Sequence, residues 1–178
     1  MSRPSHRLVL SLAALALLWA AGAAIAVGVS RRFRGVEDPC AGTASAIVVL
    51  TESHTLFLCD GGRATARIRA SIGSRGTDKR AEGDRRTPLG TYVLGEPRTS
   101  ARFGTFIPIG YPTEEQRRRG LTGAAVGLHG PERRLRWAGA ANAWVDWTAG
   151  CIALPSDAAI SVVAAEVRRR GGATITIR

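Results

Sequence analysis

Residues 46–72, AIVVLTESHTLFLCDGGRATARIRASI, decide the fold class of the chain. Two runs in this stretch, 46–51 and 55–59, are rich in apolar and β-branched residues, and small or apolar residues alternate with polar ones in a third run at 64–72. The sequence Asp-Gly-Gly at 60–62 is a turn signal between the second and third runs. We therefore predict a three-stranded meander joined by tight turns.

The rest of the domain continues as short strands with one main helix. The segment 156–170, SDAAISVVAAEVRRR, predicts an amphipathic helix, because it has a capping serine, an aspartate in the first turn and arginines in the last turn. Further short strands are expected at 90–94, 105–109, 126–129, 152–154 and 173–177, and one or two helical turns at 113–119. The expected fold is mainly β (a β-rich α+β class), with mixed sheets or a β-sandwich and one C-terminal helix.

The N-terminus is set apart by an uncharged apolar run from Leu8 to Val29. As a helix this run would be about 33 Å long, enough to cross a hydrocarbon core of about 30 Å. It is either a secretory signal, with small residues at 24–26 suited to cleavage, or a retained transmembrane anchor. The expected organisation is 1–29 signal peptide or membrane anchor, 30–44 linker and 45–178 one domain. We expect that domain outside the cytoplasmic membrane, on the periplasmic or cell-wall side.

The net charge of +11 is carried almost entirely by arginine, since Lys79 is the only lysine. The arginines are spread through loops and helix ends, and no basic helix, aromatic stacking motif or Cys/His finger organises them. Nucleic acid is therefore not an expected partner. An anionic cell wall or lipid surface fits an exported basic domain better, although a GC-rich genome would produce the same composition with no functional meaning.

The three cysteines make an odd count. Outside the cytoplasm, Cys40 and Cys59 can pair and leave Cys151 free, but the pairing stays open because Cys40 lies in the expected linker. The sequence has no CxxC or HxxxH spacing and only three histidines, so neither a metal nor another cofactor is expected.

Cys151 lies between Gly150 and an apolar run in the stretch 146–155, DWTAGCIALP. A buried cysteine often acts as a small hydrophobic residue, whereas a nucleophilic one needs a base or a positive charge beside it. His54 lies at an expected hairpin tip, where a polar residue needs no functional explanation. His129 ends a short apolar strand just before Gly-Pro, which makes it the candidate base. Glycine at 150 suits backbone amides that point at an oxyanion.

Two motifs together resemble a known family. His129-Gly130, followed after a loop by Thr-Ala-Gly-Cys-Ile at 148–152, resembles the motif of the YkuD-type L,D-transpeptidases. The stretch 86–92, RTPLGTY, is similar to a second, upstream element of that family. The resemblance covers 46–178 in the right order and implies the YkuD-like arrangement of mixed sheets.

The resemblance implies a role for each residue of the first motif. Cys151 would be the nucleophile and His129 the base that takes its proton. In the family a backbone carbonyl orients the histidine, so Gly130 is an orienting candidate. The amides of Gly150 and Cys151 are candidates for the oxyanion hole, and Thr148 is expected to orient the loop by hydrogen bonding.

The resemblance also implies a substrate and a reaction. Members of the family are cysteine-dependent acyltransferases that act on peptidoglycan. The resemblance therefore also implies a role in cell-wall organisation and cell shape. The thiolate attacks the diaminopimelate carbonyl of a tetrapeptide stem, D-alanine leaves, and an amine resolves the thioester. The acceptor amine belongs to another stem peptide, giving a 3-3 cross-link, or to a wall-attached protein. A covered cleft would favour amines over water, and either the segment 73–88 or the segment 131–144 is expected to supply the cover.

The sequence departs from many relatives at two positions. Ala153 stands where an arginine or asparagine contacts substrate, and Ala149 stands where a histidine precedes Gly-Cys. A thiol hydrolase that cuts peptide or protein linkages therefore stays an alternative, as does a non-catalytic, basic wall-binding domain. Trp147, Trp144 and Tyr111 are the substrate-binding candidates.

Overall fold

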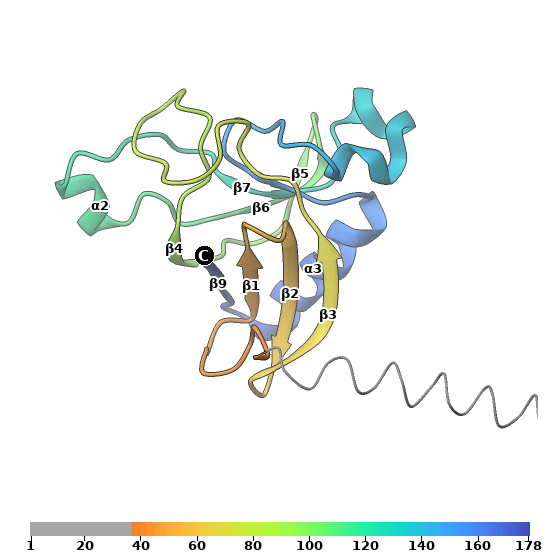
Figure 1. Ribbon diagram of the computed structural model, residues 1–178, viewed down its shortest axis with the longest axis horizontal. Helices are drawn as coiled ribbons and strands as arrows, with labels where there is room; N and C mark the ends of the chain where they lie inside the picture. The colour runs from red at the N-terminus through yellow and green to blue at the C-terminus, as the bar shows by residue number, and fades with distance from the viewer. Residues whose placement is uncertain (1–36) are drawn as a thin grey trace, which may run out of the picture. The chain divides into compact units, whose positions relative to one another are not determined.

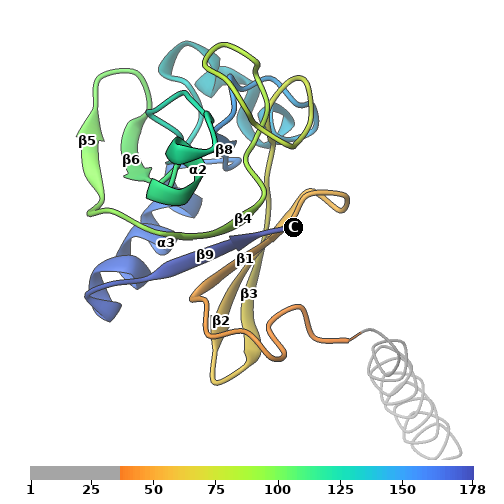
Figure 2. The same cartoon turned by 90° about the vertical axis from the view of Figure 1, so that its left-hand side faces the viewer.

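The computed structural model describes residues 37–178 as two β-sheets with helix α3, Asp157–Arg170, reaching from one sheet to the other (Figures 1 and 2). The signal peptide or membrane anchor expected at 1–29 lies outside the described residues. Within residues 37–178, no helix is both long enough and apolar enough to cross a membrane. The β-rich fold with one main helix that the sequence predicts is confirmed.

The expected meander forms three strands of a five-stranded sheet. Its strands are β1 (Ile47–Leu50), β2 (Thr55–Asp60), β3 (Arg63–Arg69), β4 (Gly90–Val93) and β9 (Thr174–Ile177), in the order β3-β2-β1-β9-β4. Neighbours in the meander are antiparallel, whereas β9 runs parallel to β1 and antiparallel to β4. The sheet is therefore mixed, and the last strand of the chain lies inside it, between β1 and β4.

The second sheet has four strands. These are β5 (Arg98–Ser100), β6 (Gly104–Pro108), β7 (Gly127–His129) and β8 (Ile152–Ala153), in the order β5-β6-β7-β8. The β7–β8 pair is parallel and the other pairs are antiparallel. The long connection between β7 and β8 contains two 3-10 segments within η1 (Arg133–Ala143), which join at Gly139. Neither β5 nor η1 was expected from the sequence.

Helix α3 begins and ends where the sequence predicts. The Ser156 hydroxyl accepts a hydrogen bond from the amide of Ala159 at 3.1 Å, and Gly171 ends the helix in the left-handed conformation. The buried face of α3 packs into one core shared with both sheets, whose members include Ile160, Leu128 and Ile175. The short helix α2 (Glu114–Arg118) begins at the expected cap, Thr113, with a reciprocal capping box.

The compact unit begins at Asp38, so the last residues of the expected linker pack on the domain. Cys40 is fully buried and forms a disulfide with Cys59 on β2. The Asp38 carboxylate accepts the amides of Cys40 and Ala64. The pairing left open by the sequence is thus present, and it ties the N-terminal end of the domain to the meander.

Replacing both Cys40 and Cys59 with serine is expected to lower the free energy of unfolding by about 3 kcal/mol, because the disulfide closes a short loop in the unfolded chain. Denaturant unfolding of the two proteins measures the difference. As a control, a reducing agent should lower the midpoint of the wild type but leave that of the double variant in place. Equal midpoints for oxidised wild type and variant would refute the prediction.

Candidate active site

The parallel pairing of β7 and β8 places His129 and Cys151 on one face of the second sheet. Leu128 pairs with Ile152, and His129 pairs with Ala153. Cys151 lies two residues before Ala153, immediately before β8, so its side chain is on the same face as those of Ala153 and His129. Paired residues point to the same side of a sheet, and side chains alternate along each strand. Two residues far apart in the sequence are thereby brought to neighbouring strands.

His129 is held as a neutral base. Its side chain is buried, and its Nδ1 lies 2.6 Å from the carbonyl oxygen of Gly130. A carbonyl oxygen only accepts hydrogen bonds, so Nδ1 carries the proton and Nε2 is free to accept one. Burial lowers the pKa of His129 to about 4, against the opposing effect of the Gly130 contact. The imidazole is therefore uncharged at neutral pH.

The ring of His129 is fixed by aromatic neighbours. The ring of Phe103 stacks on it with centroids 3.7 Å apart, and Trp147 meets it edge-on at 5.7 Å. Trp147 is itself held, because its Nε1 donates to the carbonyl oxygen of Asn142 at 2.9 Å. Of the three expected substrate-binding residues, Trp147 alone contacts the histidine.

Cys151 carries the only free thiol of the chain, since the other two cysteines are joined. Its Sγ donates to the carbonyl oxygen of Ala125 at 3.6 Å, and its side chain is partly exposed. Burial raises the pKa of the thiol, while the Gly127 backbone and the charges of Lys79 and Arg102 lower it. A thiol with a raised pKa is protonated at neutral pH, so it needs a base to become a nucleophile.

The turn that carries the thiol uses the hydroxyl of Thr148 twice. Thr148 Oγ1 donates to the carbonyl oxygen of Cys151 at 2.7 Å and accepts from the amide of Gly150 at 3.1 Å. Gly150 has a φ of +125°, a conformation that favours glycine. Its amide is thus occupied, whereas the amide of Cys151 has no hydrogen-bond partner within residues 37–178. Of the two amides expected for an oxyanion hole, only that of Cys151 is free to bind one.

A cavity of about 360 Å³ lies beside these groups. It is lined by Arg98, Thr99, Ser100, Ala101, Phe103, Phe106 and Ala125. Neither His129 nor Cys151 lines this cavity, but two of its lining residues contact them: Phe103 stacks on His129, and the carbonyl oxygen of Ala125 accepts the thiol of Cys151. The Arg98 guanidinium lies 5.2 Å from the centroid of the Phe106 ring. Arg98 forms no ion pair with any residue in the described part of the chain.

The structure does not bring every expected residue to this site. Tyr111 is buried elsewhere, with its hydroxyl donating to the carbonyl oxygen of Lys79 at 3.0 Å. Trp144 is 70% exposed and does not line the cavity. His54 pairs with Asp146 at 2.9 Å, a contact that ties the β1–β2 hairpin to the stretch before Thr148. Within residues 37–178, no cluster of three or more histidine, cysteine or acidic side chains could hold a metal ion.

The sequence matches one family model. The model of the YkuD family, the L,D-transpeptidase catalytic domain, matches residues 44–172. None of the curated proteins matches the sequence of this chain closely.

Several solved structures share the fold. The helical cell shape determining protein Pgp2 from Campylobacter jejuni superposes with a TM-score of 0.59 at 20% identity, covering 74% of this chain and 46% of that one. Bd1075 from Bdellovibrio bacteriovorus superposes with a TM-score of 0.54 at 21% identity, and the match covers 76% of this chain and 48% of that one. An L,D-transpeptidase from Mycobacterium smegmatis superposes with a TM-score of 0.51 at 14% identity, and the match covers 75% of this chain and 59% of that one. The chain thus spans about half the length of these proteins, and the likeness is one of fold.

Proposed function

Because the chain belongs to the YkuD family of L,D-transpeptidase catalytic domains, we propose that it is a cysteine-dependent acyltransferase that acts on peptidoglycan stem peptides. The observation that supports this most is the placement of the free thiol of Cys151 and the unprotonated nitrogen of His129 on one face of adjacent strands. We place the peptide in the cavity whose lining residues Phe103 and Ala125 contact His129 and the Cys151 thiol, respectively.

In the proposed reaction His129 first accepts the thiol proton through Nε2. The thiolate attacks the carbonyl of the diaminopimelate residue at the third stem position, and the amide of Cys151 stabilises the oxyanion. The carbon–nitrogen bond to the terminal D-alanine breaks, His129 returns the proton to the leaving amine, and a thioester remains. An acceptor amine then attacks the thioester while His129 takes its proton, and the thiol is regenerated.

The proposed acceptor is an amine of a second stem peptide or of a wall-attached protein. We place this reaction in the cell envelope, outside the cytoplasm, with the apolar segment at 8–29 as a membrane anchor or secretion signal. The fold shared with Pgp2, a helical cell shape determining protein, supports a contribution to cell shape through the cross-linking of the wall.

Incubation of the full chain, purified in detergent, with a disaccharide-tetrapeptide and excess glycine tests the proposal. Mass spectrometry should show loss of D-alanine together with glycine-exchanged stems or stem dimers, and Cys151→Ala should give none of these products. A cysteine-dependent tripeptide alone would show instead that water is the acceptor and the protein a thiol hydrolase. No cysteine-dependent product would favour a wall-binding domain.

The cavity leads to a prediction about Arg98. Position 153, which is a buried alanine here, cannot supply a cation to the substrate. Arg98 lines the cavity without an acidic partner in residues 37–178, so we expect it to bind a carboxylate of the stem peptide. Arg98→Gln should raise KM about tenfold with kcat within about twofold, because a charge-assisted hydrogen bond contributes about 1.5–3 kcal/mol. Steady-state kinetics with the stem tetrapeptide measure KM and kcat separately.

Arg63, an exposed arginine at the start of β3, provides the matched control. Arg63→Gln removes the same charge far along the meander and should leave both constants unchanged. A fall in kcat alone for Arg98→Gln would contradict a binding role.

A further inference from the structure

The loop at 73–87 lies against the turn that carries Cys151. Thr87, at the end of this loop, is completely buried. Its hydroxyl accepts the amide of Gly73 at 2.9 Å and donates to the carbonyl oxygen of Gly150 at 3.1 Å. The amide of Ser74 also donates to the carbonyl oxygen of Thr148 at 2.9 Å. The loop therefore contacts both ends of the turn, and Thr87 contacts the residue just before the nucleophile.

The hydroxyl of Thr87 fixes the carbonyl group of Gly150 and, with it, the direction of the Cys151 amide. The peptide bond between Gly150 and Cys151 is planar, and in a trans peptide the C=O and the N–H point in opposite directions. A hydrogen bond that holds the Gly150 oxygen therefore also sets the direction of the Cys151 amide. That amide is the one without a partner at the turn within residues 37–178.

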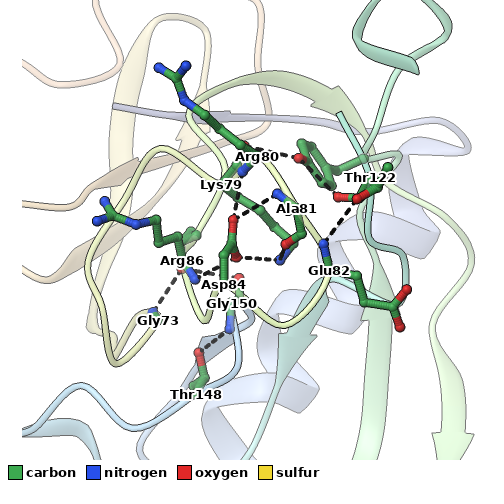
Figure 3. Close-up of polar contacts among 12 residues, drawn as sticks. Gly73, Lys79, Arg80, Ala81, Glu82, Asp84, Arg86, Thr122, Thr148 and Gly150 are labelled. Carbon is green, nitrogen blue, oxygen red and sulfur yellow. Dashed lines mark hydrogen bonds and ion pairs between the residues drawn. The ribbon is translucent and has the colours of Figure 1, made fainter. Parts of the chain in front are cut away.

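The loop is in turn held by an ion pair between the buried Lys79 and the partly exposed Asp84 (Figure 3). Lys79 Nζ lies 2.8 Å from Asp84 Oδ1, and only 3% of the Lys79 side chain is exposed. The Asp84 carboxylate also accepts the backbone amides of Arg80, Ala81 and Arg86, at 2.7, 3.0 and 3.1 Å. These bonds fix the segment that leads directly into Thr87.

The ion pair also lies close to the turn itself. A Cβ at position 150 would meet the Cδ of Lys79 at 3.7 Å and would clash with the carbonyl oxygen of Arg86. Only a glycine at 150 allows the loop to approach this closely. Lys79, Arg86 and Thr87 thus enclose the Gly150 side of the peptide, and little room remains for that peptide to rotate.

We propose that Thr87 is a positioning residue for acyl transfer: its hydroxyl orients the Cys151 amide toward the oxyanion, and the Lys79–Asp84 pair holds Thr87 in place. The inference rests on the proposed function to the extent that Cys151 forms a tetrahedral intermediate. It assigns a role to a loop that neither contributes the nucleophile nor lines the cavity.

Two reactions of the same thiol separate positioning from folding. In acylation by p-nitrophenyl acetate, a C–S bond forms, an oxyanion develops, and p-nitrophenolate leaves. In alkylation by iodoacetamide, the thiolate displaces iodide and no oxyanion develops. Thr87→Val keeps the shape of the side chain but loses the hydroxyl. It should slow acylation about tenfold to hundredfold, somewhat less than the loss of a whole oxyanion donor, and change alkylation less than about twofold.

Thr87→Ser restores the hydroxyl and should restore acylation, which a role in packing alone does not predict. Asp84→Asn, which weakens the support of the loop without touching Thr87, provides a second variant if Thr87→Val folds poorly. It should also lower the ratio of acylation to alkylation. Circular dichroism melts of each variant establish that it is folded at the assay temperature.

An equal fall in both reactions, or unchanged acylation in Thr87→Val, would overturn the inference. The proposed function can fail separately. If the tetrapeptide is never processed but the ratio of the two rates falls as expected, Thr87 still positions the amide of a reactive thiol. If the tetrapeptide is processed and the ratio does not change, the inference alone is wrong.

Discussion

Cys151→Ser should lower the rate of D-alanine release by roughly a thousandfold or more, as expected when a nucleophile is removed. A hydroxyl is far harder to deprotonate than a thiol, and His129, with its pKa lowered to about 4 by burial, is too weak a base to activate it. The side chain is nearly unchanged in size and partly exposed, so the midpoint of thermal unfolding should move little. Product analysis by mass spectrometry measures the first effect and calorimetry the second.

The variant with serine at both Cys40 and Cys59 is the control for Cys151→Ser, because it makes the same cysteine-to-serine change away from the proposed nucleophile. It replaces two cysteines that lie in the disulfide and should keep the rate of D-alanine release below its melting temperature. A thioester of the stem peptide should be trapped on that variant but not on Cys151→Ser. If Cys151→Ser kept even a tenth of the activity, the thiol would not be the nucleophile.

The meander and helix α3 could be predicted because their determinants are local. An apolar run specifies β2, alternating residues specify β3, a two-glycine turn joins the two strands, and Ser156 and Gly171 mark the ends of α3. Strand β5 escaped prediction because it has only three residues, Arg-Thr-Ser, and gains its pairing from β6. Its stability comes from tertiary contacts that a short polar sequence does not reveal.

The candidate site depends on a pairing that no local pattern encodes. Cys151 and His129 stood out by residue type and motif, but their common face follows from the parallel register of β7 and β8 across a long connection. Phe103 was missed because a phenylalanine between two short strands is typical of ordinary packing, and only the stack on His129 distinguishes it. No feature of the sequence marks that stack.

Tyr111 shows the opposite case. Tyr111 was a substrate-binding candidate, yet its ring packs edge-on against Tyr92 and its hydroxyl donates within the protein. The sequence alone does not distinguish a tyrosine of the core from one of a cleft, because both have an apolar body and a polar tip. The segment 73–88 was one of two proposed covers of the cleft, and that role stays a prediction; its contact with the turn through Thr87 was not expected from the sequence.

His129 should give the protein an unusually acid-tolerant activity profile. The imidazole is a base only when neutral, and burial lowers its pKa from 6.5 to about 4. At pH 5.5 an ordinary histidine is mostly protonated, whereas His129 stays mostly neutral. We therefore expect kcat/KM to hold down to about pH 5 and to fall with an apparent pKa near 4, measured with the stem tetrapeptide. His129→Gln should lower kcat roughly a thousandfold at every pH.

The lowered pKa of His129 also makes the free energy of unfolding depend on pH in acid. Measuring that dependence distinguishes loss of activity by protonation of His129 from loss by unfolding. Because the pKa of His129 is lower in the folded state, its stabilisation is complete above about pH 6.5 and is lost as the pH falls toward 4. The loss should approach about 3 kcal/mol, since each pKa unit corresponds to about 1.4 kcal/mol. His129→Gln cannot be protonated, so its free energy of unfolding should depend less on pH in this window than that of the wild type. If the acid limb of activity instead lay near pH 6.5 while the wild type stayed folded, His129 would be exposed to solvent during turnover, and a buried neutral base would be excluded.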